Sequence, residues 1–435
     1  MWNEAVQTLP RAELERLQLE RLQRLVATLH ARVPFYRDRM DALGVAPSDI
    51  HTLADLARLP FTSKADMREG YPFGLFAVDP SEIVEVHMSS GTTGKPVVDG
   101  YTRADLEVWG DVMARTLDMG GVGRDDVVQN AYGYGLFTGG FGVHHGAQAI
   151  GATVIPISSG NTVRQLQTMV DFGTTALTCT PSYAMFMAEH ARDMGVDVRS
   201  LKLRAGFFGA EPWSEAMRAD LEAKLGIKAF DIYGLTELIG PGVGAECEQQ
   251  DGLHIFEDVF YPEIVDPVTG EPLPPGTQGE LVLTAIGREG SPVLRYRTHD
   301  ITYLMGEPCP CGRSSRRIHR LMGRNDDMLI IRGVNVFPQQ VEEVLLRVQG
   351  VEPHYRLIVE RDGSMDTLTV EVEMSEATFS DEMRVLVHFE RQLESDLKAA
   401  LGIQAACVLV NPRTIERSEG KAKRVIDRRE LSNAR

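Results

Sequence analysis

The sequence predicts an α/β protein with a large, layered N-terminal domain and a small α+β domain at its C-terminal end. Its 435 residues suffice for two or three domains of about 150 residues each. In the middle of the chain short apolar runs alternate with helical stretches, the pattern of parallel βα units. The four runs are ATVIPI at 152–157, ALTCT at 176–180, LRAGFFG at 203–209 and AFDIYG at 229–234. In such sheets ligands bind in the loops that follow the strands.

The first element expected in chain order is an amphipathic helix over residues 11–32. Its polar face carries charges of both signs, which indicates a helix packed on the protein rather than on a membrane. Apolar residues recur at helical spacing. They are Leu14, Leu17, Leu22, Leu25, Val26 and Leu29.

Beyond residue 326 the pattern changes to that of a separate α+β unit. A helix is expected over 339–348, strands over 355–360 and 367–373, and a last strand over 406–410. A long helix before that last strand carries apolar residues on one face, which gives the unit a core of its own. These residues are Met383, Leu386, Phe389, Leu393, Leu397 and Leu401.

Composition and charge exclude several classes of protein. The formal net charge of −17 speaks against nucleic-acid binding, which needs a basic face. The chain contains no apolar run of about 20 residues and its first residues lack a signal-peptide layout, so neither membrane insertion nor secretion is expected. Five cysteines in so long a chain are too few for a disulfide framework, so the reducing cytoplasm is the expected location.

The strongest local motif is the segment HMSSGTTGKP at residues 87–96. Its glycines allow close backbone approach, its hydroxyls donate hydrogen bonds, and consecutive N–H groups can cradle an anion. The spacing differs from a Walker P-loop, because only two residues separate the glycines and proline follows the lysine. A phosphate-binding loop is therefore expected, with a simple Ser/Thr/Gly surface turn as the alternative. Its residues are Ser89, Ser90, Gly91, Thr92, Thr93, Gly94 and Lys95.

Five further segments complete one pattern with that loop. They are YGLTE at 233–237, YRTHD at 296–300, GRNDDM at 323–328, IRGVNVFP at 331–338 and SEGKAKR at 418–424. In this order the chain resembles the adenylate-forming superfamily, and within it the phenylacetate–CoA ligase family. The AYGYGLFTG segment at 131–139, the IRGVNVFP run and the length are typical of that family.

The resemblance implies a fold and a set of nucleotide-binding residues. It implies a large adenylation domain over 1–325 and a mobile cap domain over 326–435. The loop at 89–95 would hold the ATP phosphates, and Thr236 and Glu237 would lie near the α-phosphate and Mg²⁺, a hard cation that prefers oxygen ligands. The residues implied for the adenine and ribose are Gly209, Ala210, Glu211, Pro212, Asp231, Tyr233, Gly234, Asp300 and Arg324.

Two residues are implied to act with the cap domain. Lys421 matches the catalytic lysine that neutralises charge between carboxylate and α-phosphate, and Lys423 is the nearby competitor for this role. Residues 411–435 carry eight basic and four acidic side chains, a net +4 that suits a polyanionic substrate such as ATP or CoA; a solvated tail is the alternative. Asp326 matches the hinge position, although an Asx-type turn residue is the alternative.

An aromatic stretch is compatible with a flat apolar acid pocket. Core packing is the alternative for these side chains. The residues after YGLTE should line the opposite wall. The expected pocket residues are Tyr132, Tyr134, Gly135, Phe137 and Phe141 on one side and Ile239, Gly240 and Pro241 on the other.

These features predict an ATP-dependent ligase that converts an aryl acid to its CoA thioester through an acyl-adenylate, releasing AMP and pyrophosphate. By resemblance the acid is phenylacetate, with indoleacetate or an aminobenzoate as alternatives. Other hypotheses are an adenylation enzyme that loads a carrier protein and a nucleotide-binding protein without turnover. Neither a nucleic-acid nor a membrane partner is expected, and a homodimer is a family expectation.

Four soft ligands predict a structural zinc site. Cys309 and Cys311 form a C-x-C pair in a Pro/Gly-rich turn, and Cys247 and His254 lie upstream in a glycine-containing loop. Together they supply Cys₃His, a closed tetrahedral set suited to Zn²⁺. Two unrelated reduced thiol pairs are the alternative. The remaining cysteines, Cys179 and Cys407, fall in expected strands.

Overall fold

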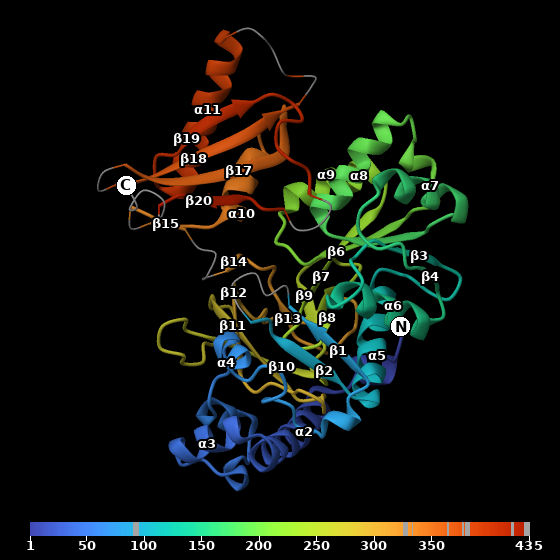
Figure 1. Ribbon diagram of the computed structural model, residues 1–435, viewed down its shortest axis with the longest axis vertical. Helices are drawn as coiled ribbons and strands as arrows, with labels where there is room; N and C mark the ends of the chain where they lie inside the picture. The colour runs from blue at the N-terminus through green and yellow to red at the C-terminus, as the bar shows by residue number, and fades with distance from the viewer. Residues whose placement is uncertain are drawn as a thin grey trace. The chain divides into compact units, whose positions relative to one another are not determined.

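The computed structural model describes residues 1–89, 95–324, 329–332, 334–362, 365–375, 378, 383–418 and 422–429. Backbone contacts divide the chain into two compact units (Figure 1). Unit 1 comprises Met1–Cys179, Val196–Ala210 and Ile227–Leu321. Unit 2 comprises Thr180–Gly195, Glu211–Gly226 and Met322–Arg435.

An eight-stranded sheet forms the centre of unit 1, in the order β13-β9-β8-β7-β6-β5-β3-β4. The neighbours from β7 to β4 pair in parallel, which confirms the βα units predicted from the sequence. The neighbours from β13 to β7 pair antiparallel. The strands are β3 (Val127–Asn130), β4 (Thr153–Ile155), β5 (Ala176–Cys179), β6 (Ala205–Gly209), β7 (Lys228–Leu235), β8 (Gly240–Glu246), β9 (Leu253–Ile255) and β13 (Arg317–Ile318).

Three helices of unit 1 directly precede strands of this sheet in the sequence: α5 (Arg103–Met119) precedes β3, α6 (Thr138–Ile150) precedes β4 and α7 (Thr162–Phe172) precedes β5. Helices α5 and α6 pack against each other and against β8 (Figure 1). Helix α5 begins at a capping box in which Thr102 and Asp105 satisfy each other's backbone N–H groups. Helix α7 begins at Asn161 and ends at Gly173, whose positive φ of 63° favours glycine.

The N-terminal part of unit 1 is helical. Helix α2 (Arg11–Arg32) has the bounds predicted from the sequence. Leu17 is only half-buried, whereas Gln18 is buried and donates to the Glu257 carbonyl oxygen at 2.9 Å, so one polar residue takes part in the buried face. The other elements are α1 (Glu4–Gln7), α3 (Pro34–Leu43), η1 (Pro47–Asp49), η2 (Leu53–Arg58), α4 (Lys64–Glu69), η3 (Pro80–Glu82) and η4 (Val198–Ser200).

Two small sheets complete unit 1. Strands β1 (Glu85–Met88) and β2 (Val98–Tyr101) pair antiparallel. Strands β10 (Phe260–Val265), β11 (Gly279–Ala285) and β12 (Tyr296–Thr302) pair antiparallel in that order. One continuous apolar core joins these sheets, the N-terminal helices and the large sheet.

Unit 2 contains a four-stranded sheet in the order β19-β18-β17-β20 and a core of its own. The sheet and its core confirm the separate α+β unit, although β15, β16 and β20 were not predicted. Helices α8 (Pro181–Asp193) and α9 (Glu215–Leu225), from the middle of the chain, also belong to it. Its other elements are β14 (Gly323–Arg324), β15 (Leu329–Ile331), β16 (Val334–Val336), α10 (Pro338–Leu345), β17 (Val351–Asp362), β18 (Met365–Met374), α11 (Met383–Leu401), β19 (Ala406–Val410) and β20 (Val425–Asp427).

Within the described part of the chain, no helix has the length and apolarity that crossing a membrane requires.

Candidate active site

The predicted phosphate loop follows β1 (Glu85–Met88) in the sequence. Ser89 fixes its base twice: its N–H donates to the Val97 carbonyl oxygen at 3.0 Å, and its Oγ accepts from the Val97 N–H at 2.9 Å. Lys95 is exposed, with Nζ 5.8 Å from the centre of the Tyr71 ring. The loop residues between them, Ser90, Gly91, Thr92, Thr93 and Gly94, lie outside the described residues.

Thr236 and Glu237 follow the carboxyl end of β7, where a parallel sheet places its ligand-binding loops. Both side chains are buried. Lys64 Nζ lies 3.1 Å from Glu237 Oε1, and Thr138 Oγ1 lies 3.5 Å from Thr236 Oγ1. Lys64, at the first position of α4, is thus the ion-pair partner of Glu237, and the sequence gives no motif signal for it.

Tyr233 and Asp300, implied for the adenine and the ribose, are in direct contact. The Tyr233 hydroxyl donates to Asp300 Oδ2 at 2.5 Å, and both residues are buried. Strand β7 supplies the tyrosine and β12 the aspartate. One oxygen of this carboxylate is thus fixed by a phenol, so the structure brings these two predicted residues into one site.

Asp231, two residues before Tyr233, has a basic partner. Arg320 Nε lies 3.3 Å from Asp231 Oδ2, and the Asp231 N–H donates to Glu246 Oε2 at 2.8 Å. Gly234 is half-buried. Arg320 was not predicted, because no local pattern connects it to residues far earlier in the chain.

The segment at 209–212 divides between the two units. Gly209 ends β6 in unit 1, and a Cβ atom there would collide with the Ile232 carbonyl oxygen, which explains the glycine. Ala210 follows with a positive φ of 68°. In unit 2 the Glu211 carboxylate accepts from the backbone N–H groups of Ser182 and Ala422, each at a distance below 3 Å.

The remaining nucleotide and cap-domain residues belong to unit 2. Pro212 is exposed, and Arg324 lies half-buried in β14. Lys421 directly precedes Ala422, but it and the predicted hinge residue Asp326 lie outside the described residues.

The pocket candidates at 132–141 differ in burial and fall into three groups. Tyr132 belongs to the buried core, and Gly135 and Phe137 are exposed. Tyr134 and Phe141 are half-buried with ring centres 5.3 Å apart, and the Tyr134 hydroxyl lies 2.8 Å from Asn130 Nδ2 and 3.2 Å from His144 Nδ1. Burial raises the pKa of Tyr134 to about 12, so the phenol is neutral.

The two predicted walls of the acid pocket adjoin each other through Thr138 and Gly142, which were not themselves predicted. A Cβ atom on Gly142 would lie 2.6 Å from Pro241 Cγ, and one on Gly240 would lie 2.6 Å from Thr138 Cβ. The start of α6 is therefore packed directly against the segment that follows YGLTE. Ile239 is buried there and Pro241 is half-buried.

Comparison with known proteins identifies the family. The model of the AMP-binding enzyme family matches residues 15–287, and that of the AMP-binding enzyme C-terminal domain matches residues 333–429. The phenylacetate–coenzyme A ligase of Thermus thermophilus is 49% identical over 99% of this chain and 100% of its own. That of Escherichia coli K12 is 47% identical over 97% of this chain and 96% of its own.

The chain belongs to the phenylacetate–CoA ligase family of AMP-binding enzymes.

This result confirms the family resemblance seen in the motifs. Among solved structures, 2-hydroxyisobutyryl-CoA ligase in complex with an acyl-AMP matches with a TM-score of 0.93 and 32% identity, covering 99% of this chain and 93% of that one. The phenylacetate–CoA ligase family thus accounts for the fold of both units.

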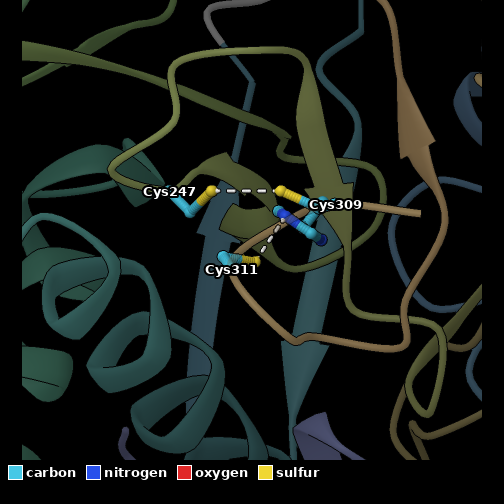
Figure 2. Close-up of side chains that lie close together, drawn as sticks. Cys247, Cys309 and Cys311 are labelled. Carbon is cyan, nitrogen blue, oxygen red and sulfur yellow. Dashed lines mark hydrogen bonds between the residues drawn. The ribbon is translucent and has the colours of Figure 1, made fainter. Parts of the chain in front are cut away.

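Outside the nucleotide residues, this member of the phenylacetate–CoA ligase family has a cluster of soft ligands in unit 1. The ligand atoms of Cys247, His254, Cys309 and Cys311 all lie within 4.8 Å of one another. Cys247 Sγ lies 3.7 Å from Cys309 Sγ, and Cys311 Sγ lies 3.4 Å from His254 Nε2 (Figure 2). The two sequence pairs predicted to combine therefore meet at one point.

The environment of the cluster suits a metal ion. Its Cys₃His donor set is the kind that binds structural zinc. Ser315 Oγ lies 3.0 Å from His254 Nδ1, which orients the ring with Nε2 toward the thiols. Cys179 and Cys407, as expected, are buried in strands β5 and β19.

Proposed function

We propose that this protein is an ATP-dependent phenylacetate–CoA ligase. The observation that carries the proposal is its identity of 47–49% with phenylacetate–CoA ligases over nearly the whole chain. The contact between Tyr233 and Asp300 and the buried Glu237 support a nucleotide site at the loops expected for it. Phenylacetate is the acid proposed, because the relatives named for that substrate span both family domains.

The proposed reaction has two steps. In the first, a carboxylate oxygen of the acid forms a bond to the α-phosphorus of ATP and the bond to pyrophosphate breaks. In the second, the CoA thiolate forms a bond to the carbonyl carbon and the bond to AMP breaks. Lys421 stabilises the charge that develops during the first step, because only that step joins the carboxylate to the phosphate.

The residues of the candidate site are assigned nucleotide-binding roles in this proposal. The 89–95 loop holds the ATP phosphates, Asp300 accepts from the ribose hydroxyls, and Arg324 assists it. The segment at 209–212, with Asp231, Tyr233 and Gly234, frames the adenine. Thr236 and Glu237 are the residues that would hold Mg²⁺, which neutralises phosphate charge when bound; the buried carboxylate of Glu237 suits this role, because Mg²⁺ prefers oxygen ligands.

On the acid side, we propose that the ring lies between the aromatic stretch at 132–141 and the segment at 239–241. The packing of Gly142 against Pro241 supports this placement, because it puts the start of α6, which carries Phe141, beside the segment at 239–241. We also propose a functional division at residue 325, with Asp326 as the hinge of the C-terminal domain. The family-model matches, which end at 287 and resume at 333, support a boundary between them.

The decisive experiment is a release assay over a panel of aryl acids. Purified protein is given ATP, Mg²⁺, CoA and phenylacetate, indoleacetate or an aminobenzoate, and both AMP and thioester are measured. We expect the highest kcat/KM with phenylacetate and one AMP for each thioester. AMP release that requires a carrier protein, or a preference for another acid, would contradict the proposal.

A second proposal concerns the cysteine–histidine cluster. We propose that Cys247, His254, Cys309 and Cys311 bind a structural zinc ion, since four protein donors close the tetrahedron and leave no open position for substrate. The ion would tie β9 and the end of β8 to the segment at 309–311. Its role is therefore stability.

Metal analysis of protein purified without a His-tag tests the zinc proposal. We expect about one equivalent of zinc in the wild type, as in other closed sites, and its loss in Cys309→Ser together with a lower Tm. Cys407→Ser removes a buried thiol from β19 and is the matched control, which should keep the zinc. Well under half an equivalent in the wild type, or full retention in Cys309→Ser, would reject the site.

We also propose a cytoplasmic location and a homodimer. None of the five cysteines, all of them described, forms a disulfide, which supports the former, because a reducing compartment keeps cysteines reduced. The dimer rests on the family resemblance and is tested by light scattering of the purified protein.

A further inference from the structure

Three buried side chains donate hydrogen bonds to one short stretch of backbone, at 238–241. Trp109 Nε1 donates to the Pro241 carbonyl oxygen at 2.8 Å, and the Tyr101 hydroxyl donates to that of Ile239 at 2.9 Å. Arg288 Nη1 donates to that of Leu238. Trp109 and Tyr101 are fully buried. We call these three residues the carbonyl clamp.

The clamped stretch has a backbone that needs such support. Gly240 and Gly242 adopt positive φ angles of 93° and 105°. Glycine gains the most backbone freedom when a chain loosens, so this conformation is costly to hold without partners. The clamp supplies these partners from β2, from α5 and from the chain after β11. Each donor lies at least 50 residues from the carbonyl group that it bonds.

The clamp residues also fix one another. The Tyr101 and Trp109 rings are stacked with centres 4.8 Å apart. The Arg288 guanidinium lies 4.5 Å from the centre of the Tyr101 ring, and its Nη1 lies 2.8 Å from both carboxylate oxygens of Asp99. The clamp is therefore one rigid layer of aromatic and charged groups.

This layer also contacts the other predicted wall. The buried His87 ring has its centre 5.5 Å from those of Tyr101 and Trp109, and 5.3 Å from that of Phe141. One packed group therefore adjoins Phe141 directly and holds the 238–241 backbone by hydrogen bonds. Neither Tyr101 nor Trp109 is exposed, so neither touches the acid.

We propose that Tyr101, Trp109 and Arg288 are positioning residues for the aryl acid: they fix the backbone at 238–241 as a rigid wall and thereby set the size of ring that the enzyme accepts. The inference rests on the proposed function, because that stretch is a wall of the acid pocket only if an aryl acid binds there. It predicts that deleting one buried donor affects acid recognition and leaves ATP recognition unchanged.

Two variants delete a donor and keep the ring: Trp109→Phe and Tyr101→Phe. We expect each to raise KM for phenylacetate about five- to tenfold, the cost of one buried hydrogen bond. KM for ATP and kcat should stay within about threefold, because the lost interaction positions the acid in ground and transition states alike. The ratio of kcat/KM for phenylacetate to that for the bulkier 1-naphthylacetate should fall, because a less rigid wall admits a larger ring.

Matched controls delete the same donors elsewhere in unit 1. Trp2→Phe removes an indole N–H that bonds Asp111 Oδ1 at 2.9 Å, and Tyr36→Phe removes a fully buried hydroxyl that bonds Thr62 Oγ1 at 3.0 Å. Both controls should leave KM for phenylacetate and the preference between the two acids unchanged. If a control raises KM for the acid as much as the clamp variants do, the specific positioning role is rejected.

Amide hydrogen exchange supplies a readout that needs no activity. We expect exchange at 238–243 to speed up several-fold in each clamp variant and in neither control. Equal rises in KM for acid and ATP, or unchanged exchange with unchanged acid KM, would overturn the inference. If the wild type turns over no aryl acid, the proposed function fails; faster exchange in the clamp variants would still establish the positioning of the backbone, and unchanged exchange would reject it.

Discussion

Two carboxylates of unit 1 are held by basic side chains in different ways. Glu237 has one cation, the Lys64 ammonium at 3.1 Å. Glu85 Oε1 contacts two imidazoles, His87 Nε2 at 2.7 Å and His145 Nε2 at 3.5 Å. Partial burial raises the pKa of Glu85, but the hydrogen bonds from His145 and His87 outweigh it and bring the pKa down to about 2.

This lowered pKa gives a prediction for stability. Because the folded pKa lies below the unfolded value of about 4.3, the stabilisation is complete above the latter and is lost as pH falls towards about 2. Glu85→Gln should lower the free energy of unfolding by about 1 kcal/mol at pH 7 and by less at pH 3. Urea unfolding at both pH values measures this. The exposed Glu271→Gln is the control, and an equal loss at both pH values would contradict the prediction.

A second residue-scale prediction separates Lys421 from Lys423. Lys421→Ala should slow adenylate formation about 10²- to 10³-fold, as loss of a group that stabilises developing charge does. Thioester formation from preformed phenylacetyl-adenylate should change little. Rapid quench of each half-reaction measures both rates. Lys423→Ala is the matched control, and equal losses in both half-reactions of Lys421→Ala would remove the residue from this role.

Individual residues also show which parts of a site can be predicted from a sequence. The YGLTE and YRTHD motifs were found because their residues are contiguous, and the structure brings Tyr233 and Asp300 together. Lys64, Arg320 and His144 were missed. Each meets its partner only through the fold, and a single lysine, arginine or histidine in the sequence does not differ from a solvated surface residue.

Among the elements, the parallel strands β4, β5, β6 and β7 were predicted from the sequence, whereas the parallel strand β3 and the antiparallel strand β8 were not. Runs such as 176–180 and 203–209 are apolar and bounded by helices, which indicates buried strands. Strand β8, GPGVGAE, contains three glycines and a proline, residues that usually argue against a strand. It forms because β7 and β9 pair with it on both sides and α5 and α6 cover it.

Gly240, the first residue of β8, tests this account. Gly240→Ala should lower the free energy of unfolding by about 2–4 kcal/mol, because a positive φ adds about 1 kcal/mol to the cost of displacing Thr138. Gly276→Ala is the matched control: its φ of 81° is also positive, but a Cβ atom meets nothing within 4 Å. Denaturant unfolding of both variants separates the cost of the positive φ from the cost of the clash with Thr138. Equal losses of unfolding free energy in the two variants would refute the contribution of the clash.

At the scale of the whole molecule, unit 2 gathers segments that lie far apart in the chain. Glu189 of α8 contacts His354 Nε2 at 2.6 Å and Arg417 Nε at 3.3 Å. Asp193 of α8 contacts Arg413 at 2.8 Å. Beyond residue 326 the sequence predicted α10, α11, β17, β18 and β19, but not β15, β16 or β20, nor that α8 and α9 would group with them. Such pairing depends on charges more than a hundred residues apart, for which periodicity gives no signal.

The proposed hinge makes a prediction about the two half-reactions. One site can serve both if the C-terminal domain moves between them. Asp326→Pro fixes φ and should leave adenylate formation within about threefold while thioester formation falls more than about tenfold. Asp326→Ala keeps the backbone free and is the control. Single-turnover assays of each step measure the split, and unchanged overall turnover of the proline variant would exclude the hinge role.

The carbonyl clamp has a consequence for attempts to redesign the enzyme. The clamp holds the main chain of residues 238–241 through donors that lie far away in the sequence. Tyr101 precedes its acceptor residue by 138 positions, and Trp109 precedes its own by 132. Saturation libraries confined to 238–241 change side chains there but not the three donors that hold the backbone. Chimeras that exchange this stretch between relatives will work only if the donors travel with it. Libraries meant to broaden the acid range should therefore include residues 101, 109 and 288 from the start.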